Sequence, residues 1–182
     1  MICGIALDSG DTLYARRRPG QALCQVAHTA AHVHHVANAA HCAFAHNKRG
    51  KVDQLVLFLG REAARVMLPR GRGTLLFTGA TASLRGGAGF AAFAGGKAAL
   101  RALAQSMARE LGPKGLHVAH VVIDGLIDTA FAREHFAQRV AEVGPDGILN
   151  PEHIAETYWW LHQQPRDAWT FELDLRPSVE RW

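Results

Sequence analysis

The side chains that could do chemistry in this sequence form two groups, and the first lies in its second half. Thr81 belongs to a glycine-rich loop, Lys97 to the stretch GFAAFAGGKAAL, and Asp124 and Thr129 to the loop DGLIDT. Their hydroxyl, ammonium and carboxylate groups can hydrogen-bond a polar ligand. The residue four positions before Lys97 is Phe93, whose ring has no proton to give. This helix therefore carries a lysine without a hydroxyl one turn before it.

A second group of reactive side chains lies in the segment QALCQVAHTAAHVHHVANAAHCAFAHNK, residues 21–48. Because alanine favours helix, Cys24, His28 and His32 would stand one turn apart on one face, with His35 nearby. Imidazole and thiolate groups one turn apart can bind zinc or copper. The segment has no acidic residue and no recognised ligand spacing, so we predict incidental histidines on a helix and no metal site. A metal-binding segment is the alternative, which metal analysis of the purified protein would test.

The hydrophobic pattern predicts the elements that hold the first group in place. Short apolar runs between glycines are typical of covered parallel strands, and apolar residues three to four positions apart indicate helices. Leu100, Leu103, Met107 and Leu111 form such a helical stripe. Asn150 is a good N-cap, with Pro151 at the first helical position. The predicted elements are helices at 55–68, 89–111, 130–142 and 151–164, and strands at 74–79, 117–123 and 169–175.

This order of elements predicts an α/β fold in which a parallel sheet carries helices on both faces. Sheets of this kind bind ligands at the carboxyl ends of their strands. In this chain those ends are followed by the loops that carry Thr81 and Asp124. The candidate site is therefore expected at one edge of the sheet, between these two loops.

Three stretches, in order, resemble the C-terminal half of a short-chain dehydrogenase/reductase. They are REAARVMLPRGRGTLLFTGATAS, then GFAAFAGGKAALRALAQSMARELGPKGLHVAHVVIDGLIDT, then the closing strand WTFELDL. The resemblance runs from about Leu55 to the C-terminus and covers roughly 130 of the 182 residues. It implies a partial Rossmann-like, doubly wound parallel sheet and descent from NAD(P)-dependent oxidoreductases.

The resemblance also implies which positions are catalytic. In that family a Tyr donates a proton to the substrate carbonyl, a Ser hydrogen-bonds the same oxygen, and a Lys assists the Tyr. Lys97 matches the Lys, whereas Phe93 stands at the Tyr position and Ala80 at the Ser position. General acid catalysis typically contributes about 10² to 10⁴ in rate, so we expect weak or no activity. Thr81 or Ser83 is a candidate for part of the lost role, and the alternative is that both cap or solvate the turn.

Cofactor contacts are implied at neighbouring positions. Lys97 would hold the nicotinamide ribose and Thr129 would touch the nicotinamide amide, while Asp124-Gly125 stands where the family has Pro-Gly. The alternative for Lys97 is a solvated helix lysine. We expect Arg85 to be an ordinary surface residue and His120 an ordinary strand residue.

Residues 1–52 differ from the rest, so we divide the chain into an atypical basic, Ala/His/Cys-rich segment and an α/β domain at 53–182. The first segment holds six basic and two acidic side chains, which account for the net charge of +4, together with all three cysteines. Neither G-x-x-x-G-x-G nor G-x-G-x-x-G occurs there, so we expect NAD or NADP binding to be weak or lost. Its composition suggests a GC-rich gene translated in another frame or from a misplaced start.

The sequence thus predicts an NAD(P)-dependent oxidoreductase by descent, weak or inactive, with a small carbonyl or alcohol substrate if active. The alternative is a non-catalytic oligomerisation module or a fragment of a longer family member, with a homo-oligomer formed through helices 55–68 and 90–111. The basic segment lacks interleaved aromatics, which argues against nucleic acid, and no apolar run reaches the roughly 20 residues that span a bilayer. Acids precede arginines at the N-terminus, the reverse of a secretory signal, so we expect a cytoplasmic protein without disulfides.

Overall fold

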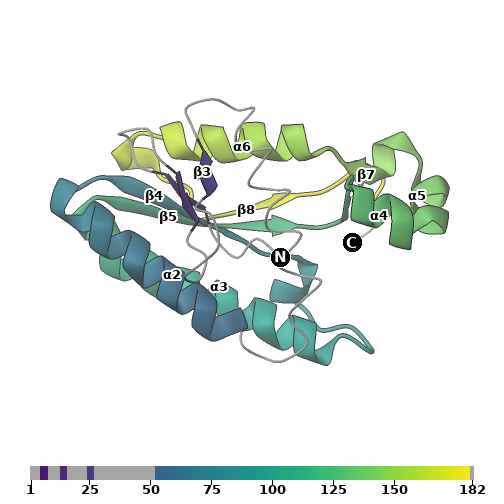
Figure 1. Cartoon of the computed structure of the whole chain (residues 1–182), viewed down its shortest axis with the longest axis horizontal. Helices are drawn as coiled ribbons and strands as arrows, with labels where there is room; N and C mark the ends of the chain where they lie inside the picture. Colours follow the sequence, from purple (N-terminus) through teal and green to yellow (C-terminus); the bar gives the residue numbers. More distant parts are fainter. Residues whose placement is uncertain (1–4, 8–12, 16–23, 27–51, 181–182) are drawn as a thin grey trace.

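A mixed four-stranded sheet forms the centre of the computed structural model, which describes residues 5–7, 13–15, 24–26 and 52–180, with side chains from residue 56 (Figure 1). The strand order is β1-β4-β5-β8, and β4, β5 and β8 run parallel to one another. The predicted parallel α/β sheet is therefore confirmed. The strands are β1 (Ile5–Leu7), β4 (Gly73–Thr78), β5 (Leu116–Ile123) and β8 (Glu172–Leu175).

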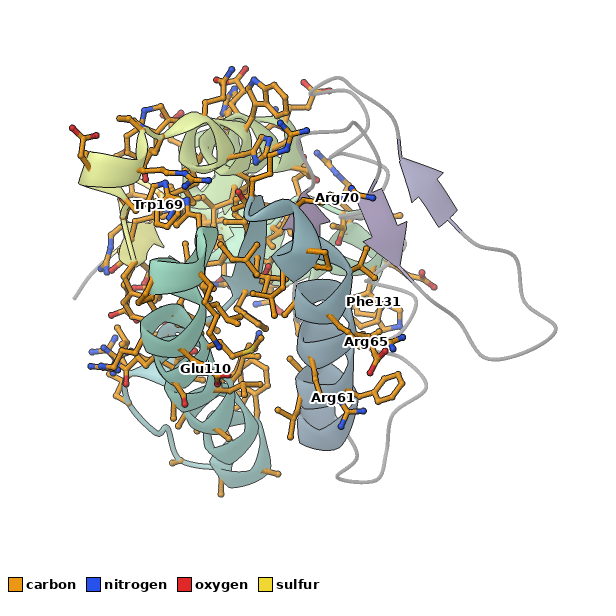
Figure 2. The ribbon with its side chains drawn as sticks, turned by 90° about the vertical axis from the view of Figure 1, so that its left-hand side faces the viewer. Arg61, Arg65, Arg70, Glu110, Phe131 and Trp169 are labelled. Carbon is orange, nitrogen blue, oxygen red and sulfur yellow. The ribbon has the colours of Figure 1, made fainter. Side chains whose placement is uncertain are left out.

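Helices cover both faces of this sheet. The helices α2 (Val52–Met67) and α3 (Ala91–Leu111) lie side by side on one face, and α6 (Pro151–Gln163) lies on the other (Figures 1 and 2). Three layers of this kind leave the carboxyl ends of the strands free of helix, because each helix runs back along the sheet. The predicted helices at 55–68, 89–111 and 151–164 are confirmed within a few residues.

Alternation along the strands divides the core into two clusters. In β4, Leu75 and Phe77 pack with α2 and α3, whereas Leu76 between them packs with α6. In β5, Val118 and Val121 point to opposite faces in the same way. Residues buried on both faces are what a covered parallel sheet requires, and this explains why the strands are apolar without interruption. Of the α3 stripe that the sequence predicts, Leu100, Met107 and Leu111 are buried against the first face, and Leu103 is partly buried against the same cluster.

Local chemistry fixes where the helices begin and how closely they pack. The Asn150 side chain accepts a hydrogen bond of 2.8 Å from the Glu152 amide, and Pro151 follows at the first helical position, as predicted. Between α2 and α3, a Cβ built on Gly60 would lie 3.2 Å from the sulfur of Met107. Glycine at this position therefore allows the two helices to approach each other.

The structure corrects several expectations. The strand β1 pairs antiparallel with β4, with Ile5 opposite Leu76, a pairing that nothing in the sequence indicated. Cys24 lies in a strand rather than in the predicted helix, because its segment pairs with another short strand and this pairing overrides the helical preference of alanine. The predicted helix at 130–142 is interrupted at Phe136, where the backbone leaves the helical region at φ −127°. The elements concerned are β2 (Leu13–Ala15), β3 (Cys24–Val26), α4 (Ala130–His135) and α5 (Ala137–Val143).

Two further short strands, β6 (Leu126–Ile127) and β7 (Ile148–Leu149), pair parallel beside α4 and α5. His28, His32 and His35 lie outside the described residues. Within the described part of the chain, no three His, Cys, Asp or Glu side chains gather around a possible metal position. Among the helices that the structure describes, none combines the length and apolar character needed to cross a bilayer.

Candidate functional site

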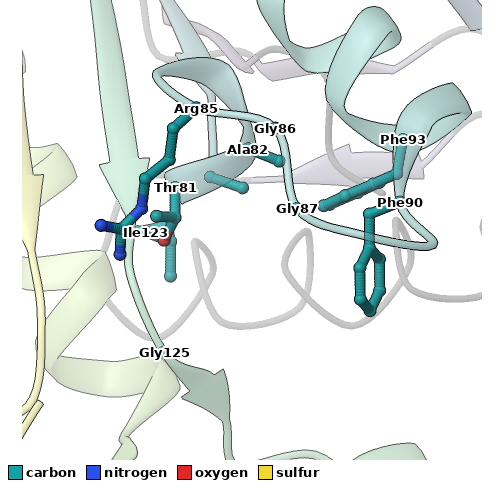
Figure 3. A pocket seen from close by; sticks show the side chains of 10 residues that line it. Thr81, Ala82, Arg85, Gly86, Gly87, Phe90, Phe93, Ile123 and Gly125 are labelled. Carbon is teal, nitrogen blue, oxygen red and sulfur yellow. The ribbon is translucent and has the colours of Figure 1, made fainter. Parts of the chain in front are cut away.

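A pocket of about 340 Å³ opens where β4 and β5 end, at the edge that the fold predicts for a ligand (Figure 3). Ala80, Thr81, Phe93 and Gly125, four of the sequence-predicted site residues, lie in its wall. Three segments far apart in the sequence therefore meet here: the loop after β4, the first turn of α3, and the loop after β5. The full lining is Ala80, Thr81, Ala82, Arg85, Gly86, Gly87, Phe90, Phe93, Ile123 and Gly125.

Thr81 connects the pocket to a buried acid. Its hydroxyl donates a hydrogen bond to Oδ1 of Asp124, and Asp124 is 8% exposed. The other carboxylate oxygen, Oδ2, lies 3.1 Å from Nη1 of Arg176, which also pairs with Asp174. The negative charge of the buried carboxylate is thus balanced by a guanidinium, as buried charges require. Residue 124, which the sequence resemblance aligns with a Pro, is therefore part of a polar network.

Lys97 is buried, so its interpretation as a solvated helix lysine is wrong. It is 3% exposed, and its Nζ donates a 2.7 Å hydrogen bond to the backbone carbonyl of Thr78, at the end of β4. The ring of Phe93 lies one turn before it, with its centroid 6.0 Å from the Lys97 Nζ. A buried ammonium next to an aromatic face is favourable electrostatically. Phe93 and Lys97 are therefore close in space, but only Phe93 lines the pocket.

His120 is a fully buried residue of a polar network and not an ordinary strand residue. Its Nδ1 lies 2.9 Å from Oε2 of Glu172, which Arg101 binds through two hydrogen bonds of 2.6 and 2.7 Å. Burial lowers the pKa of His120, and the hydrogen bond to Glu172 opposes that effect. The hydrogen bond from Arg101 lowers the pKa of Glu172. Burial therefore favours the neutral imidazole, whose Nε2 lacks a hydrogen-bond partner.

The two remaining hydroxyl candidates are occupied by local structure. Ser83 accepts a 3.1 Å hydrogen bond from the amide of Ala80, which supports its role in capping the turn. Thr129 caps α4 by accepting a 3.1 Å hydrogen bond from the amide of Ala132, and it is not among the pocket-lining residues. Arg85 is exposed, as expected, but its side chain runs along the pocket wall toward Thr81 (Figure 3).

A further contact that the sequence did not reveal fixes the end of β4 from the opposite face. The Tyr158 hydroxyl of α6 lies 2.8 Å from the hydroxyl of Thr78, and burial raises the pKa of Tyr158. The pattern of buried positions in α6 places Tyr158 on the side that faces the sheet. No sequence pattern identifies Thr78 as its partner. The same holds for Glu172 and Arg176, whose partners depend on the β5–β8 register.

Comparison with known proteins supports the resemblance seen in the sequence. The family model described as enoyl-(acyl carrier protein) reductase matches residues 25–170, so the match begins within the segment where the resemblance had faded. (+)-Borneol dehydrogenase 2 of Salvia officinalis is 33% identical over 93 residues, which are 50% of this chain and 32% of that protein. The chain thus spans about a third of this curated relative.

Solved structures give the same result. A short-chain dehydrogenase from Rhodopseudomonas palustris is 38% identical, with a TM-score of 0.52 over 82% of this chain and 70% of that one. A serine dehydrogenase complexed with NADP+ shares the fold at 20% identity, with a TM-score of 0.62 over 71% of this chain and 54% of that one. From the family match and the Rhodopseudomonas likeness together, this chain belongs to the short-chain dehydrogenase/reductase family.

Proposed function

We propose that the pocket beside β4 and β5 receives the nicotinamide end of NAD or NADP together with a small alcohol or carbonyl compound. The observation that carries this proposal is the buried Lys97 below Phe93, at the carboxyl edge of the parallel strands. This edge is where open α/β sheets bind their ligands. When bound, the nicotinamide ring would accept or supply a hydride.

The residues at this edge fit the nicotinamide end in charge and shape. The acid nearest the pocket, Asp124, has its charge balanced by Arg176, so it would not repel an anionic cofactor. Ile123 and Gly125 bring no charge to the pocket wall, and the buried Lys97 ammonium lies 6.0 Å from the ring centroid of the lining residue Phe93. Support for the phosphate end is weaker, because residues 1–52 carry no glycine-rich phosphate motif. We therefore propose weak dinucleotide affinity.

Turnover by the family's usual acid is proposed to be weak or absent. The wall of the pocket has a phenyl ring at Phe93 and a methyl group at Ala80, and neither can donate or accept a proton. Loss of a general acid typically lowers the rate by about 10² to 10⁴. Because neither side chain brings a charge into the pocket, we propose that the pocket can still bind a ligand.

The lining also indicates the class of substrate. Phe90 and Phe93 supply aromatic rings, and Arg85 is the single charged side chain among the lining residues (Figure 3). A volume of about 340 Å³ suits a small molecule. We propose an aromatic or apolar alcohol, with better binding when it carries a carboxylate that can reach Arg85.

Thermal unfolding followed by circular dichroism, with and without NADH or NADPH, tests the proposed cofactor site. Binding to the native state raises the free energy of unfolding by mass action, by about 2.7 kcal/mol at a concentration 100 times the Kd, and so raises the midpoint. The Lys97→Met variant should lose the shift, whereas Lys114→Met, which removes an exposed lysine beyond the end of α3, should keep it. Each variant is compared with its own ligand-free melt, because Lys97→Met also removes a buried hydrogen bond. No shift with either dinucleotide in the unaltered chain would contradict the proposal.

A second candidate function is a non-catalytic homo-oligomer, as the surface of α2 suggests. Leu57, Phe58 and Val66 are 51%, 44% and 47% exposed, and the Arg61 guanidinium lies 5.5 Å from the centroid of the Phe58 ring. Figure 2 shows Arg61 and Arg65 on this helix, beside α3. Apolar side chains grouped on one helix are typical of association surfaces.

Light scattering coupled to size-exclusion chromatography tests this second candidate. The chain should elute as an oligomer, and Phe58→Glu should shift it toward the monomer. Trp160→Glu, which changes a similarly exposed aromatic side chain on α6, should leave the oligomer unchanged. A monomer at all concentrations would exclude this candidate without bearing on the pocket.

A further inference from the structure

We propose that Thr81 and Asp124 form a proton relay for a hydroxyl-bearing ligand in the pocket, replacing the acid that Phe93 lacks. The inference rests on the proposed function, which supplies the alcohol and the oxidant. In this relay Thr81 passes a proton on, whereas the family's Ser, which Thr81 was a candidate to replace, hydrogen-bonds the substrate oxygen.

The geometry separates the two members of the relay. Thr81 lies in the pocket wall, between Arg85 and Ile123 in Figure 3, whereas Asp124 is 8% exposed and is not a lining residue. A ligand in the pocket can therefore reach the hydroxyl and not the carboxylate. Their hydrogen bond joins the two, so Thr81 is the path from the pocket to the buried acid.

The direction of this hydrogen bond determines what the pocket recognises. A hydroxyl has one proton to donate and two lone pairs that accept. The Thr81 proton points to Oδ1 of Asp124, so a ligand meets the lone pairs. Those lone pairs accept from the O–H of an alcohol and offer nothing to a carbonyl oxygen. The resting arrangement therefore favours alcohol oxidation over carbonyl reduction.

The surroundings of Asp124 suit a proton acceptor. Arg176 lies on Oδ2, which leaves Oδ1 to Thr81, so the two partners use different oxygens of the same carboxylate. Other hydroxyls nearby are excluded by position. Ser83 is engaged with the Ala80 amide, and Tyr158 is 2% exposed on the far face of the sheet. Thr81 is the one hydroxyl residue among the ten that line the pocket.

In the proposed step, a proton leaves the alcohol and Thr81 passes a proton on to Asp124. The O–H bond of the alcohol breaks and its proton forms a new O–H bond on Oγ1 of Thr81. The original O–H bond of Thr81 breaks at the same time, and that proton forms an O–H bond on Oδ1 of Asp124. The carbinol carbon loses a hydride and becomes a carbonyl carbon, which requires an oxidised nicotinamide dinucleotide as acceptor. Thr81 gains one proton and loses one, so it ends unchanged, and Asp124 regains its carboxylate form by releasing its proton to water.

A spectroscopic measurement tests the relay without turnover. In protein labelled with ¹³C at the aspartate carboxyls, the Asp124 resonance is assigned by its loss in Asp124→Asn, and 1-phenylethanol is added without cofactor. The Asp124 resonance should move in the unaltered chain and in Thr81→Ser, and stay fixed in Thr81→Val. Thr157→Val, which removes a hydroxyl from α6, should respond like the unaltered chain. An Asp124 resonance that does not respond to the alcohol, or responds equally in Thr81→Val, overturns the relay.

Kinetics separate failure of the relay from failure of the proposed function. With 1-phenylethanol and NAD+ or NADP+, Thr81→Val and Asp124→Asn should each lower kcat by about 10² or more, with the dinucleotide Kd unchanged. Thr81→Ser should retain activity, and Asp128→Asn, which removes a half-buried carboxylate paired with Arg133, should match the unaltered chain. Full activity in Thr81→Val would overturn the relay and leave the proposed function standing. An unaltered chain with neither turnover nor a dinucleotide-dependent melt contradicts the proposed function, and the carboxyl resonance then decides the relay alone.

Discussion

His120 and Glu172 face each other directly across the β5–β8 pair, with 2.9 Å between Nδ1 and Oε2. The contact joins a fully buried imidazole to a carboxylate that also binds Arg101 of α3. It lies on the same side of the sheet as Lys97 and directly beneath the start of the pocket loop at Gly79.

Stability should therefore fall as the pH is lowered through the ordinary pKa of histidine, 6.5. Burial lowers the pKa of His117, His120 and His162, so the unfolded chain binds protons at a pH where the folded chain does not. The free energy of unfolding then decreases with falling pH, by at most about 1.4 kcal/mol per pH unit for each such histidine. Glu172, whose pKa is also lowered, adds a separate loss at lower pH, below its ordinary value of 4.5.

Urea unfolding at a series of pH values between 8 and 5 (a range around that pKa) measures this effect. The His120→Asn variant should show a smaller decrease than the unaltered chain. His153→Gln, on the exposed side of α6, should not change the slope. A free energy of unfolding that is flat across this range would contradict the neutral, buried state of these histidines.

Gly79→Ala should destabilise the fold by about 1–3 kcal/mol, through overpacking. A Cβ at Gly79 would lie 2.3 Å from Nε2 of His120, and the ring cannot retreat because Glu172 holds its other nitrogen. Gly86→Ala is the matched control, because nothing lies within 4 Å of a Cβ there. In a His120→Ala background the cost of Gly79→Ala should shrink, and an undiminished cost would refute the steric explanation.

Several of these features were predictable from sequence and others were not, for physical reasons. The stripe of α3 and the N-cap at Asn150 are local patterns, and each is confirmed. The burial of Lys97 and the Glu172 partner of His120 depend on how distant strands and helices align, which no local pattern encodes. The antiparallel pairing of β1 belongs to the same class of long-range contact.

Restoring the two family hydroxyls should raise turnover if the pocket binds cofactor and substrate as proposed. Phe93→Tyr combined with Ala80→Ser places a proton donor and a hydrogen-bonding group in the pocket wall, one helical turn before Lys97. We expect the double variant to reduce acetophenone at least about tenfold faster than the unaltered chain. Phe136→Tyr, which adds a hydroxyl to an exposed ring outside the pocket, should have no effect.

Arg85 should distinguish between alcohols that differ only by a carboxylate. Arg85→Leu should raise the KM for mandelate by roughly two- to fivefold, the size expected of an exposed ion pair, and leave that for 1-phenylethanol unchanged. Arg139→Leu, on α5 and away from the lining residues, controls for overall charge. Equal effects on both alcohols would argue against recognition of an anionic group by this side chain.

Thr78 is held from both faces of the sheet, since its carbonyl accepts from Lys97 of α3 and its hydroxyl meets Tyr158 of α6. The two helices on opposite faces are thereby linked through one residue that directly precedes the pocket loop. Local opening of either helix would break one of these bonds, so the end of β4 should open only together with the helical layers, as one cooperative unit. In amide hydrogen exchange, the last residues of β4 should therefore exchange as slowly as the centre of β5, although they border a pocket open to water.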